Sequence, residues 1–409
     1  MKWQTKKLGE ICDISIGKTP ARNNKRFWDS EKKHSNVWLS IRDLKKTNGK
    51  NVSESLEYIS DVGASFLKKV KKGTLLVSFK LTLGRLAFAG IDLYTNEAIA
   101  ALKIKKETEL YKEYLYYYLS FFDWDAETKG DMKVKGKTLN KAKLREISVL
   151  FPPLLEQKRL VALLDDVFEK LDRVKENAER NLENAKGVFE SYLESIFAKS
   201  DGKWEKRRLG DEKLVQIIDG DRGKNYPKKS DFLEEGYCLF LNTKNVRPDG
   251  FDFKIKMFIT KNKDNLLGNG KIQRNDVLLT TRGTIGNIAI YDKKVPFENI
   301  RINSGMLIFR PDTKIILPEY LFKVFQSGIM KLQIKKSVSG AAQPQLPIKT
   351  LINFSIPVPK SLSQQKSIVA KLDALSGEVK RLERIYRKKL DDIEELKKSV
   401  LQKAFKGEL

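Results

Sequence analysis

The chain has 409 residues, and its 79 Lys and Arg side chains against 53 Asp and Glu give a formal net charge of +26. Hydrophobic residues make up 41% of the sequence, which is enough apolar surface for folded domains and excludes a disordered basic tail. Two cysteines, Cys12 and Cys238, and one histidine, His34, exclude a disulfide scaffold and a two-histidine metal site. No apolar segment is long enough for a membrane span, and the N-terminus lacks a signal-peptide core. We expect a soluble cytoplasmic protein, without a membrane partner, that binds a polyanion.

The sequence contains an internal repeat, which is the strongest guide to its architecture. Similar strings recur in the same order: Trp3…Leu8-Gly9 as Trp204…Leu209-Gly210, Asn96 as Asn303, Glu113-Tyr114-Leu115 as Glu319-Tyr320-Leu321, and Glu156-Gln157-Lys158 as Gln364-Gln365-Lys366. From Glu156 to Ser191 the first copy aligns with the second without a gap. Each repeat is therefore predicted to be a variable globular part followed by a helix of fixed length.

Apolar residues at alternating three- and four-residue steps predict one long coiled-coil helix in each repeat. The predicted seam of the first helix comprises Leu164, Val167, Leu171, Val174, Ala178, Ala185, Val188 and Tyr192. That of the second comprises Leu372, Leu375, Val379, Leu382, Tyr386, Ile393, Leu396 and Val400. Asn181 and Lys389 occupy equivalent positions on these seams, where a polar residue fixes how two helices align.

Chain continuity predicts how the repeats are arranged. Only residues 199–203 separate the first helix from the second globular part, and five residues reach at most about 18 Å. We therefore predict two long antiparallel helices with a globular domain at each end, related by an approximate two-fold axis. The alternative is two independent globules, each folding its helix onto itself. The predicted segments are globular domains over residues 1–154 and 199–362, and helices over residues 155–198 and 363–409.

The globular parts are predicted to be mixed and mostly β, which makes the chain an α+β protein. Short strands bounded by Gly, Asp or Asn are expected at residues 73–79, 99–104, 277–281, 288–291 and 306–309. Residues 114–118 and 320–325 are expected to form amphipathic helices. The helical spacing of their aromatic residues favours core packing over base stacking.

The positive charge lies almost entirely on the globular parts. Residues 1–155 carry 30 basic and 18 acidic side chains, and residues 199–362 carry 30 and 17, while the two helices together are nearly neutral. Two matched basic modules predict two contacts with the phosphates of one nucleic acid. A stiff helical spacer favours double-stranded DNA, whose groove repeats at about 34 Å per turn. The alternative is a structural protein that bridges DNA or binds RNA without sequence specificity.

Motifs of catalysis are not found in the sequence. Phe151-Pro-Pro-Leu154 and Ile356-Pro-Val-Pro359 lack the polar and aromatic members of an adenine methyltransferase loop. Gly268-Asn-Gly-Lys271 and Gly283-Thr-Ile-Gly286 lack the spacing of a phosphate-binding loop. We expect a protein that recognises its ligand and is not an enzyme.

The sequence resembles the specificity (S) subunits of Type I restriction–modification systems. The resemblance rests on strings distributed over the whole chain: Gly17-Lys-Thr-Pro20, Phe27-Trp28, Val37-Trp-Leu39, Asp43, Phe151-Pro-Pro-Leu-Leu-Glu-Gln157, Asp221-Arg-Gly223, Tyr226-Pro227, Thr281-Arg-Gly-Thr-Ile-Gly286, and Ile356-Pro-Val-Pro359 with Gln364-Gln365. The order and the duplication of these strings are specific, although each string alone is not.

The resemblance implies more than the residues do by themselves. Each globular part would be a target recognition domain that reads one half of a bipartite DNA site, and the helices would set the spacer between the halves. Two modification (M) subunits with S-adenosylmethionine and two restriction (R) subunits with ATP and magnesium would bind the chain. The chain itself would hold no cofactor and no metal.

Candidate DNA-contacting residues are those whose side chains suit bases or phosphates and that lie in loops beside strands. Arg282 follows a predicted strand and precedes Gly283, which lets the backbone approach a ligand closely. The complete set of DNA-binding candidates is Lys18, Lys80, Lys135, Lys137, Arg222, Lys224, Thr281, Arg282 and Gln343. The candidates for the contact between the helices are Leu164, Leu171, Asn181, Leu372, Val379 and Lys389.

Overall fold

The computed structural model describes residues 3–45, 50–128, 132–133, 136–198, 204–248, 250–339 and 344–409. The chain divides into two compact units, one of Met1–Ala178 with Lys388–Leu409 and one of Glu179–Arg387. Each unit combines one β-rich domain with a segment of each long helix. Because the end of the second helix belongs to the first unit, the alternative of two globules with separate helices is wrong.

The domain of the first unit is built on a five-stranded sheet in the order β2-β10-β6-β8-β4. Its strands are β2 (Cys12–Ile16), β10 (Ile99–Ile104), β6 (Leu75–Ser78), β8 (Leu86–Ala89) and β4 (Asn51–Val52). All pairs are antiparallel except β4 with β8. Smaller sheets join β5 (Glu57–Tyr58), β3 (Val37–Leu39) and β9 (Tyr94–Thr95); β11 (Met132–Lys133), β12 (Gly136–Thr138) and β7 (Lys80–Leu81); and β1 (Gln4–Lys7) with β13 (Ser148–Phe151).

The domain of the second unit repeats this plan with one strand fewer in the main sheet. Its four antiparallel strands are β15 (Val215–Asp219), β23 (Met306–Pro311), β20 (Val277–Thr280) and β21 (Ile288–Ile290). The smaller sheets join β19 (Phe258–Ile259), β16 (Cys238–Leu241) and β22 (Ile300–Ile302); β17 (Val246–Arg247) and β18 (Gly250–Phe251); and β14 (Glu205–Arg208) with β24 (Ser355–Val358). The five strands predicted from the sequence are β6, β10, β20, β21 and β23.

Short helices cover the sheets of each domain. They are α1 (Leu8–Ile11), α2 (Asp61–Ser65), α3 (Lys112–Phe121) and α4 (Lys141–Glu146) in the first, and α6 (Lys261–Leu266), α7 (Pro318–Gln326), α8 (Gly328–Ser337) and α9 (Ile348–Leu351) in the second. The predicted aromatic helices are α3 and α7. Tyr114 and Tyr320 are fully buried in the two cores, so the prediction that these aromatic residues pack inside rather than stack on bases is confirmed.

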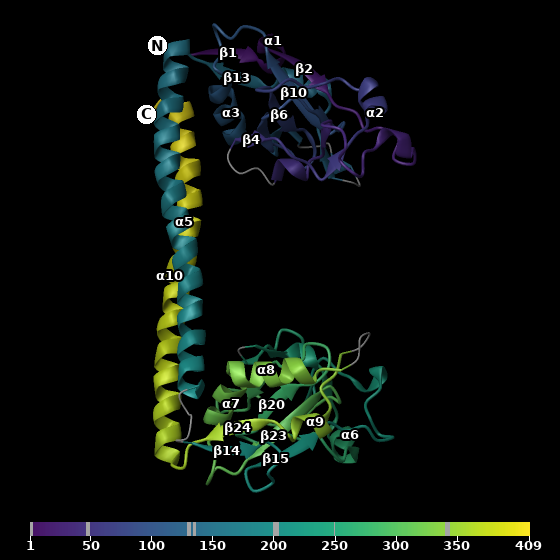
Figure 1. Ribbon diagram of the computed structural model, residues 1–409, viewed down its shortest axis with the longest axis vertical. Coiled ribbons are helices and arrows are strands. Elements are labelled where there is room, and N and C mark those ends of the chain that lie inside the picture. The colour runs from purple at the N-terminus through teal and green to yellow at the C-terminus, as the bar shows by residue number, and fades with distance from the viewer. Residues whose placement is uncertain are drawn as a thin grey trace. The chain divides into compact units, whose positions relative to one another are not determined.

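The two long helices are α5 (Leu154–Ala198) and α10 (Leu362–Lys406), which Figure 1 shows side by side in teal and yellow. In the first unit Lys175 Nζ lies 2.6 Å from Glu394 Oε1, and Lys397 pairs with Asp172. These pairs run in opposite directions along the two helices, so α5 and α10 are antiparallel there. Leu164 is buried with Leu401 from α10 in the first unit, and Leu372 is buried with Leu193 from α5 in the second.

Part of the predicted helix seam is not buried. Leu164, Leu372 and Val379 are buried as expected and Leu171 is half-buried, but Val174, Val188 and Tyr192 are 37%, 52% and 37% exposed. Phe189 and Leu193 are less exposed than these last two, because Phe189 offers more apolar surface than Val188, and Leu193 lacks the polar hydroxyl of Tyr192. Asn181 and Lys389, predicted to lie on the seam, are both exposed. Their neighbours Leu182 and Leu390 are the half-buried residues.

A buried glutamine at the start of each long helix attaches that helix to its domain. Gln157 Nε2 donates to the carbonyl oxygens of Glu109 (2.9 Å) and Pro152 (2.8 Å), and its Oε1 accepts from the Tyr111 N–H (2.8 Å). Gln365 makes the same three contacts with Ile315, Pro359 and Leu317. Both side chains are fully buried. The recurrence of glutamine at these positions of the repeat therefore has a structural cause.

We expect Gln157→Ala to lower the free energy of unfolding by about 1–3 kcal/mol, because one N–H and two carbonyl groups lose a buried partner. Gln365→Ala should have a similar effect in the second unit. Chemical denaturation followed by circular dichroism measures both changes. Gln402 is exposed on α10, so Gln402→Ala serves as the control and should leave stability within experimental error. If Gln157→Ala unfolds at the same denaturant concentration as the wild type, Gln157 does not attach the helix to its domain.

Candidate nucleic-acid interface

The main sheet of each domain ends in the same hairpin loop. The Gly84 N–H donates to the Ser78 carbonyl in the first domain, and the Gly286 N–H donates to the Thr280 carbonyl in the second, both at 2.9 Å. The Ser78 hydroxyl donates to Thr82 O and accepts from the Arg85 N–H. The Thr280 hydroxyl likewise donates to Thr284 O and accepts from the Asn287 N–H. Both glycines have positive φ values, 74° and 92°, which the tight return of the chain requires. The two loops therefore have equivalent hydrogen-bonded conformations.

Lys80 and Arg282 occupy the same place in these two loops. The Phe79 N–H, just before Lys80, donates to Ala98 O at 3.0 Å, and the Thr281 N–H, just before Arg282, donates to Gly305 O at 2.8 Å. Lys80 pairs with Thr138 of β12, and Arg282 forms an isolated bridge with Gln345. In each domain, three segments distant in the sequence thus meet at one end of the main sheet.

Three predicted residues of the second domain surround one turn, residues 303–305. The backbone N–H groups of Thr281 and Arg282 both donate to Gly305 O, while the Arg222 guanidinium reaches Ser304 O at 3.4 Å and Asp219 Oδ2 at 3.1 Å. Thr281 is buried and holds the loop through its backbone. The Arg222 and Arg282 side chains are exposed. Two exposed arginines are therefore carried on segments that contact the same turn.

Asp221 holds the loop that carries Arg222 and Lys224. Its carboxylate accepts the N–H groups of Gly223 (2.8 Å), Gly268 (2.8 Å) and Asn269 (3.2 Å). Burial by itself raises the pKa of Asp221, but these hydrogen bonds and the charge of Arg301 outweigh it and hold the pKa below its usual value. Lys224 is exposed at the end of the loop. Gln343 lies outside the described residues.

The first domain has a matching face around residues 95–98. The Lys18 N–H donates to Thr95 O at 2.9 Å, and the exposed Lys18 side chain leaves from this turn. Gly17 is required here, since a Cβ atom would lie 2.1 Å from Thr95 O. The string Gly17-Lys-Thr-Pro20 is therefore a packing feature that also presents one lysine. Lys137 lies in β12 beside Lys80, although only its backbone is described, and Lys135 lies outside the described residues.

Two residues of this face were not predicted. Glu97 lies on the turn of residues 95–98, which accepts the Lys18 N–H, and Leu81 follows Lys80 in β7; both side chains are exposed. Leu81 has a φ of 65°, and its equivalent in the second domain, with a φ of 69°, is Gly283. A leucine in the left-handed region is strained, and strain of this kind often marks a functional position. The available sequence signal was the alignment of Asn96 with Asn303, which places Glu97 at the centre of the turn.

We expect Leu81→Gly to raise the free energy of unfolding by about 1 kcal/mol, because glycine adopts a positive φ without strain. The same change should weaken specific DNA binding, since it removes an apolar side chain suited to a thymine methyl group. Thermal unfolding and fluorescence anisotropy measure the two effects. Leu81→Ala keeps the strain and should lose affinity without the gain in stability. Equal stability of the glycine and alanine variants would contradict the strain argument.

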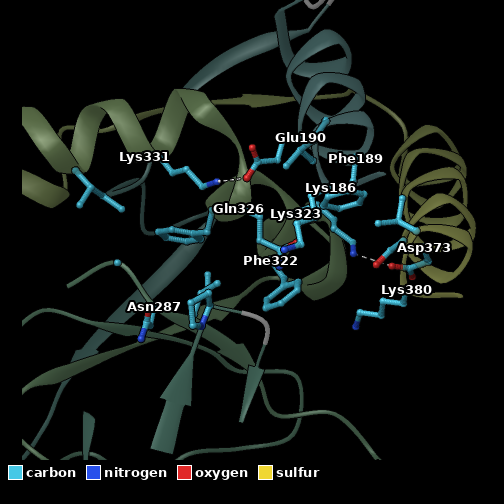
Figure 2. A pocket seen from close by; sticks show the side chains of 18 of the residues that line it. Lys186, Phe189, Glu190, Asn287, Phe322, Lys323, Gln326, Lys331, Asp373 and Lys380 are labelled. Atoms are coloured by element: carbon cyan, nitrogen blue, oxygen red, sulfur yellow. Dashed lines mark ion pairs between the residues drawn. The ribbon is translucent and has the colours of Figure 1, made fainter. Parts of the chain in front are cut away.

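A cavity of about 930 Å³ in the second unit lies between α7, α8, the segments of α5 and α10 and residues 285–288 at the end of the β20–β21 loop (Figure 2). Lys323 pairs with Asp373 at 2.7 Å, and Lys331 approaches Glu190 at 3.8 Å across its walls. In the first unit the equivalent helix carboxylate, Asp165, instead receives the Tyr117 hydroxyl and the Lys50 ammonium group. No predicted DNA-contacting residue lines the cavity. These carboxylates therefore attach helix to domain and lie outside the candidate interface.

Reactive groups and metal ligands are not gathered at these faces. Burial raises the pKa of both Cys12 and Cys238 to about 12, so neither thiol is a nucleophile at neutral pH. Among the described residues, no group of three or more His, Cys, Asp or Glu side chains could hold a metal ion. Within the same residues, no helix is long and apolar enough to cross a membrane.

The sequence model of the family described as "Type I restriction modification DNA specificity domain" matches residues 1–184 and again residues 201–391. The chain belongs to this family. Each match covers one β-rich domain and much of the long helix that follows it, so the internal repeat is a duplicated specificity domain. The chain is a DNA specificity subunit, the non-catalytic component of a restriction–modification complex.

Other specificity subunits share sequence over most of this chain. The EcoBI specificity subunit of Escherichia coli is 25% identical over 330 residues, covering 75% of this chain and 68% of that protein. The MjaVIII specificity subunit of Methanocaldococcus jannaschii is 26% identical over 386 residues, covering 87% and 85%.

Solved specificity-subunit structures have the same fold. A chain from a structure of the type I R-M system aligns with a TM-score of 0.78 and 19% identity over 100% of this chain and 98% of that one. The HsdS subunit of Thermoanaerobacter tengcongensis aligns with a TM-score of 0.57 and 19% identity, covering 100% and 97%. The arrangement of two β-rich domains with two long packed helices is therefore that of a specificity subunit.

Proposed function

We propose that this specificity subunit reads a bipartite site in double-stranded DNA, with one half-site for each β-rich domain. The observation that supports this most directly is the recurrence of one loop constellation in both domains with different side chains. Lys80 in the first domain is replaced by Arg282 in the second, and Glu97 by Ser304. The same scaffold with different reading groups suits two half-sites of different sequence.

The long helices, on this proposal, set the spacer between the half-sites. The ion pairs of Lys175 with Glu394 and of Lys397 with Asp172 hold one alignment of α5 with α10 in the first unit. The buried Gln157 and the pairing of Asp165 with Lys50 then attach α5 to its domain. Because α5 is fixed to its domain in this way, a change in helix length is expected to change the spacer between the half-sites.

Catalysis, on the same proposal, belongs to partner subunits. Two modification subunits carrying S-adenosylmethionine and two restriction subunits using ATP and magnesium would bind this chain. Membership of the specificity family supports such an assembly, and one structural relative comes from a type I R-M complex. The near-neutral helices are suited to protein contacts, since the excess positive charge lies on the domains.

The test is sequencing of N6-methyladenine in DNA from cells that carry this chain with its modification subunit. We expect methylation at a two-part motif with a fixed spacer of unspecified bases. Cells without the chain serve as the control and should lack that motif. A protein that binds random duplex as tightly as any defined site, and directs no methylation, would contradict the proposal and favour a DNA-bridging role.

A further inference from the structure

The first domain presents one carboxylate in the middle of its basic face. Glu97 lies on the turn of residues 95–98, between the segment that carries Lys18 and the loop that carries Lys80. Its side chain is exposed, and Glu97 Oε2 accepts a hydrogen bond from the Thr19 hydroxyl. The hydrogen bond fixes the orientation of this exposed carboxylate.

The surroundings of Glu97 keep it ionised. Burial alone raises its pKa, but the Thr19 hydrogen bond, the backbone N–H of Glu97 and the charges of Lys80 and Arg22 outweigh it, and the pKa lies below the usual value. An ionised carboxylate repels phosphate, so its presence on a face that binds DNA through phosphates lowers general affinity. A hydrogen bond from a base to the carboxylate would offset this loss of general affinity.

We propose that Glu97 is a specificity-determining residue that selects cytosine in the half-site read by the first domain. This inference rests on the proposed function and names the chemistry of one base contact. A carboxylate offers only acceptors, and the edge of cytosine in the major groove offers the N4 amino donor. Adenine also has an amino donor, but its N7 acceptor lies beside it and repels a carboxylate.

The second domain provides an internal comparison. Ser304 takes the place of Glu97, and its carbonyl accepts from Arg222. A hydroxyl group both donates and accepts, so it does not impose the preference of a carboxylate. The cytosine preference should therefore appear in one half-site and be missing at the equivalent position of the other.

The experiment is methylome sequencing with the full chain and its modification subunit, comparing wild type with Glu97→Gln and Glu97→Ala. Glutamine pairs with the N6 and N7 atoms of adenine, so Glu97→Gln should change one position of the first half-site from cytosine towards adenine. Glu97→Ala should lose base preference at that position. Binding to the original duplex should fall about 10-fold for both variants, while the second half-site stays unchanged.

Asp13→Asn is the matched control, because Asp13 is exposed at the opposite end of β2 from Gly17. It removes one negative charge from the same domain and should leave the motif as it is. Thermal unfolding checks that each variant is folded. An unchanged two-part motif with folded Glu97→Gln would overturn this inference and leave the proposed function intact. A wild-type chain that directs no motif would instead refute the proposed function.

Discussion

Replacing Arg282 with alanine is expected to weaken binding of the specific duplex by about 1–3 kcal/mol and to relax the base preference at one position of the second half-site. The Arg282 guanidinium is exposed, while its backbone N–H is held 3.2 Å from Gly305 O and its strand bridge is made with Gln345. The loop therefore keeps its conformation when the side chain is removed. Fluorescence anisotropy with specific and scrambled duplexes measures the difference.

Two further variants separate base reading from general charge. Arg384→Ala removes the same charge from an exposed position of α10, and we expect no change in the methylated motif. Lys80→Ala removes the equivalent side chain of the first domain and should affect only the first half-site. Unchanged affinity and an unchanged motif for Arg282→Ala would remove this residue from the interface.

Sequence periodicity was sufficient to predict the two long helices, α3, α7 and the five strands β6, β10, β20, β21 and β23. The predicted first helix covers residues 155–198, and α5 covers Leu154–Ala198. The phase of the helix contact was harder to predict, because Val167 and Phe168, like Val188 and Phe189, are adjacent apolar residues that fit either phase. Packing decides between such pairs by volume, and volume complementarity depends on the partner helix. Asn181 and Lys389 were misplaced on the seam, because their apolar neighbours Leu182 and Leu390 take the half-buried positions.

The candidate interface was only partly predictable from the sequence. Lys80 and Arg282 could be found because each follows a strand, and the repeat aligns them. Glu97 and Leu81 lie in exposed loops, where no periodic pattern distinguishes a functional side chain from a solvated one. The positions of the loops depend on hydrogen bonds between segments far apart in the chain, such as Lys18 N–H to Thr95 O. Such contacts are a property of the folded domain.

Removing seven residues from each long helix is expected to shorten the spacer of the recognised site without altering either half-site. Seven residues are two turns of a coiled coil, so the contact between the helices keeps its phase. At 1.5 Å per residue each helix loses about 10 Å, and at 3.4 Å per base pair this corresponds to about 3 base pairs. Residues 175–181 of α5 and 388–394 of α10 are suitable, because Lys175 pairs with Glu394.

The measurement is affinity for a series of duplexes that carry both half-sites and differ only in spacer length. Removing residues 175–181 from α5 alone is the control, since Glu394 then loses its partner Lys175 and the two helices differ in length by seven residues. We expect that variant to lose stability rather than acquire a new preferred spacer. The double deletion should remain folded, because its remaining ion pairs and apolar contacts are still in register. A folded double deletion that prefers the original spacer would show that the distance between half-sites is set by a feature other than the helix pair.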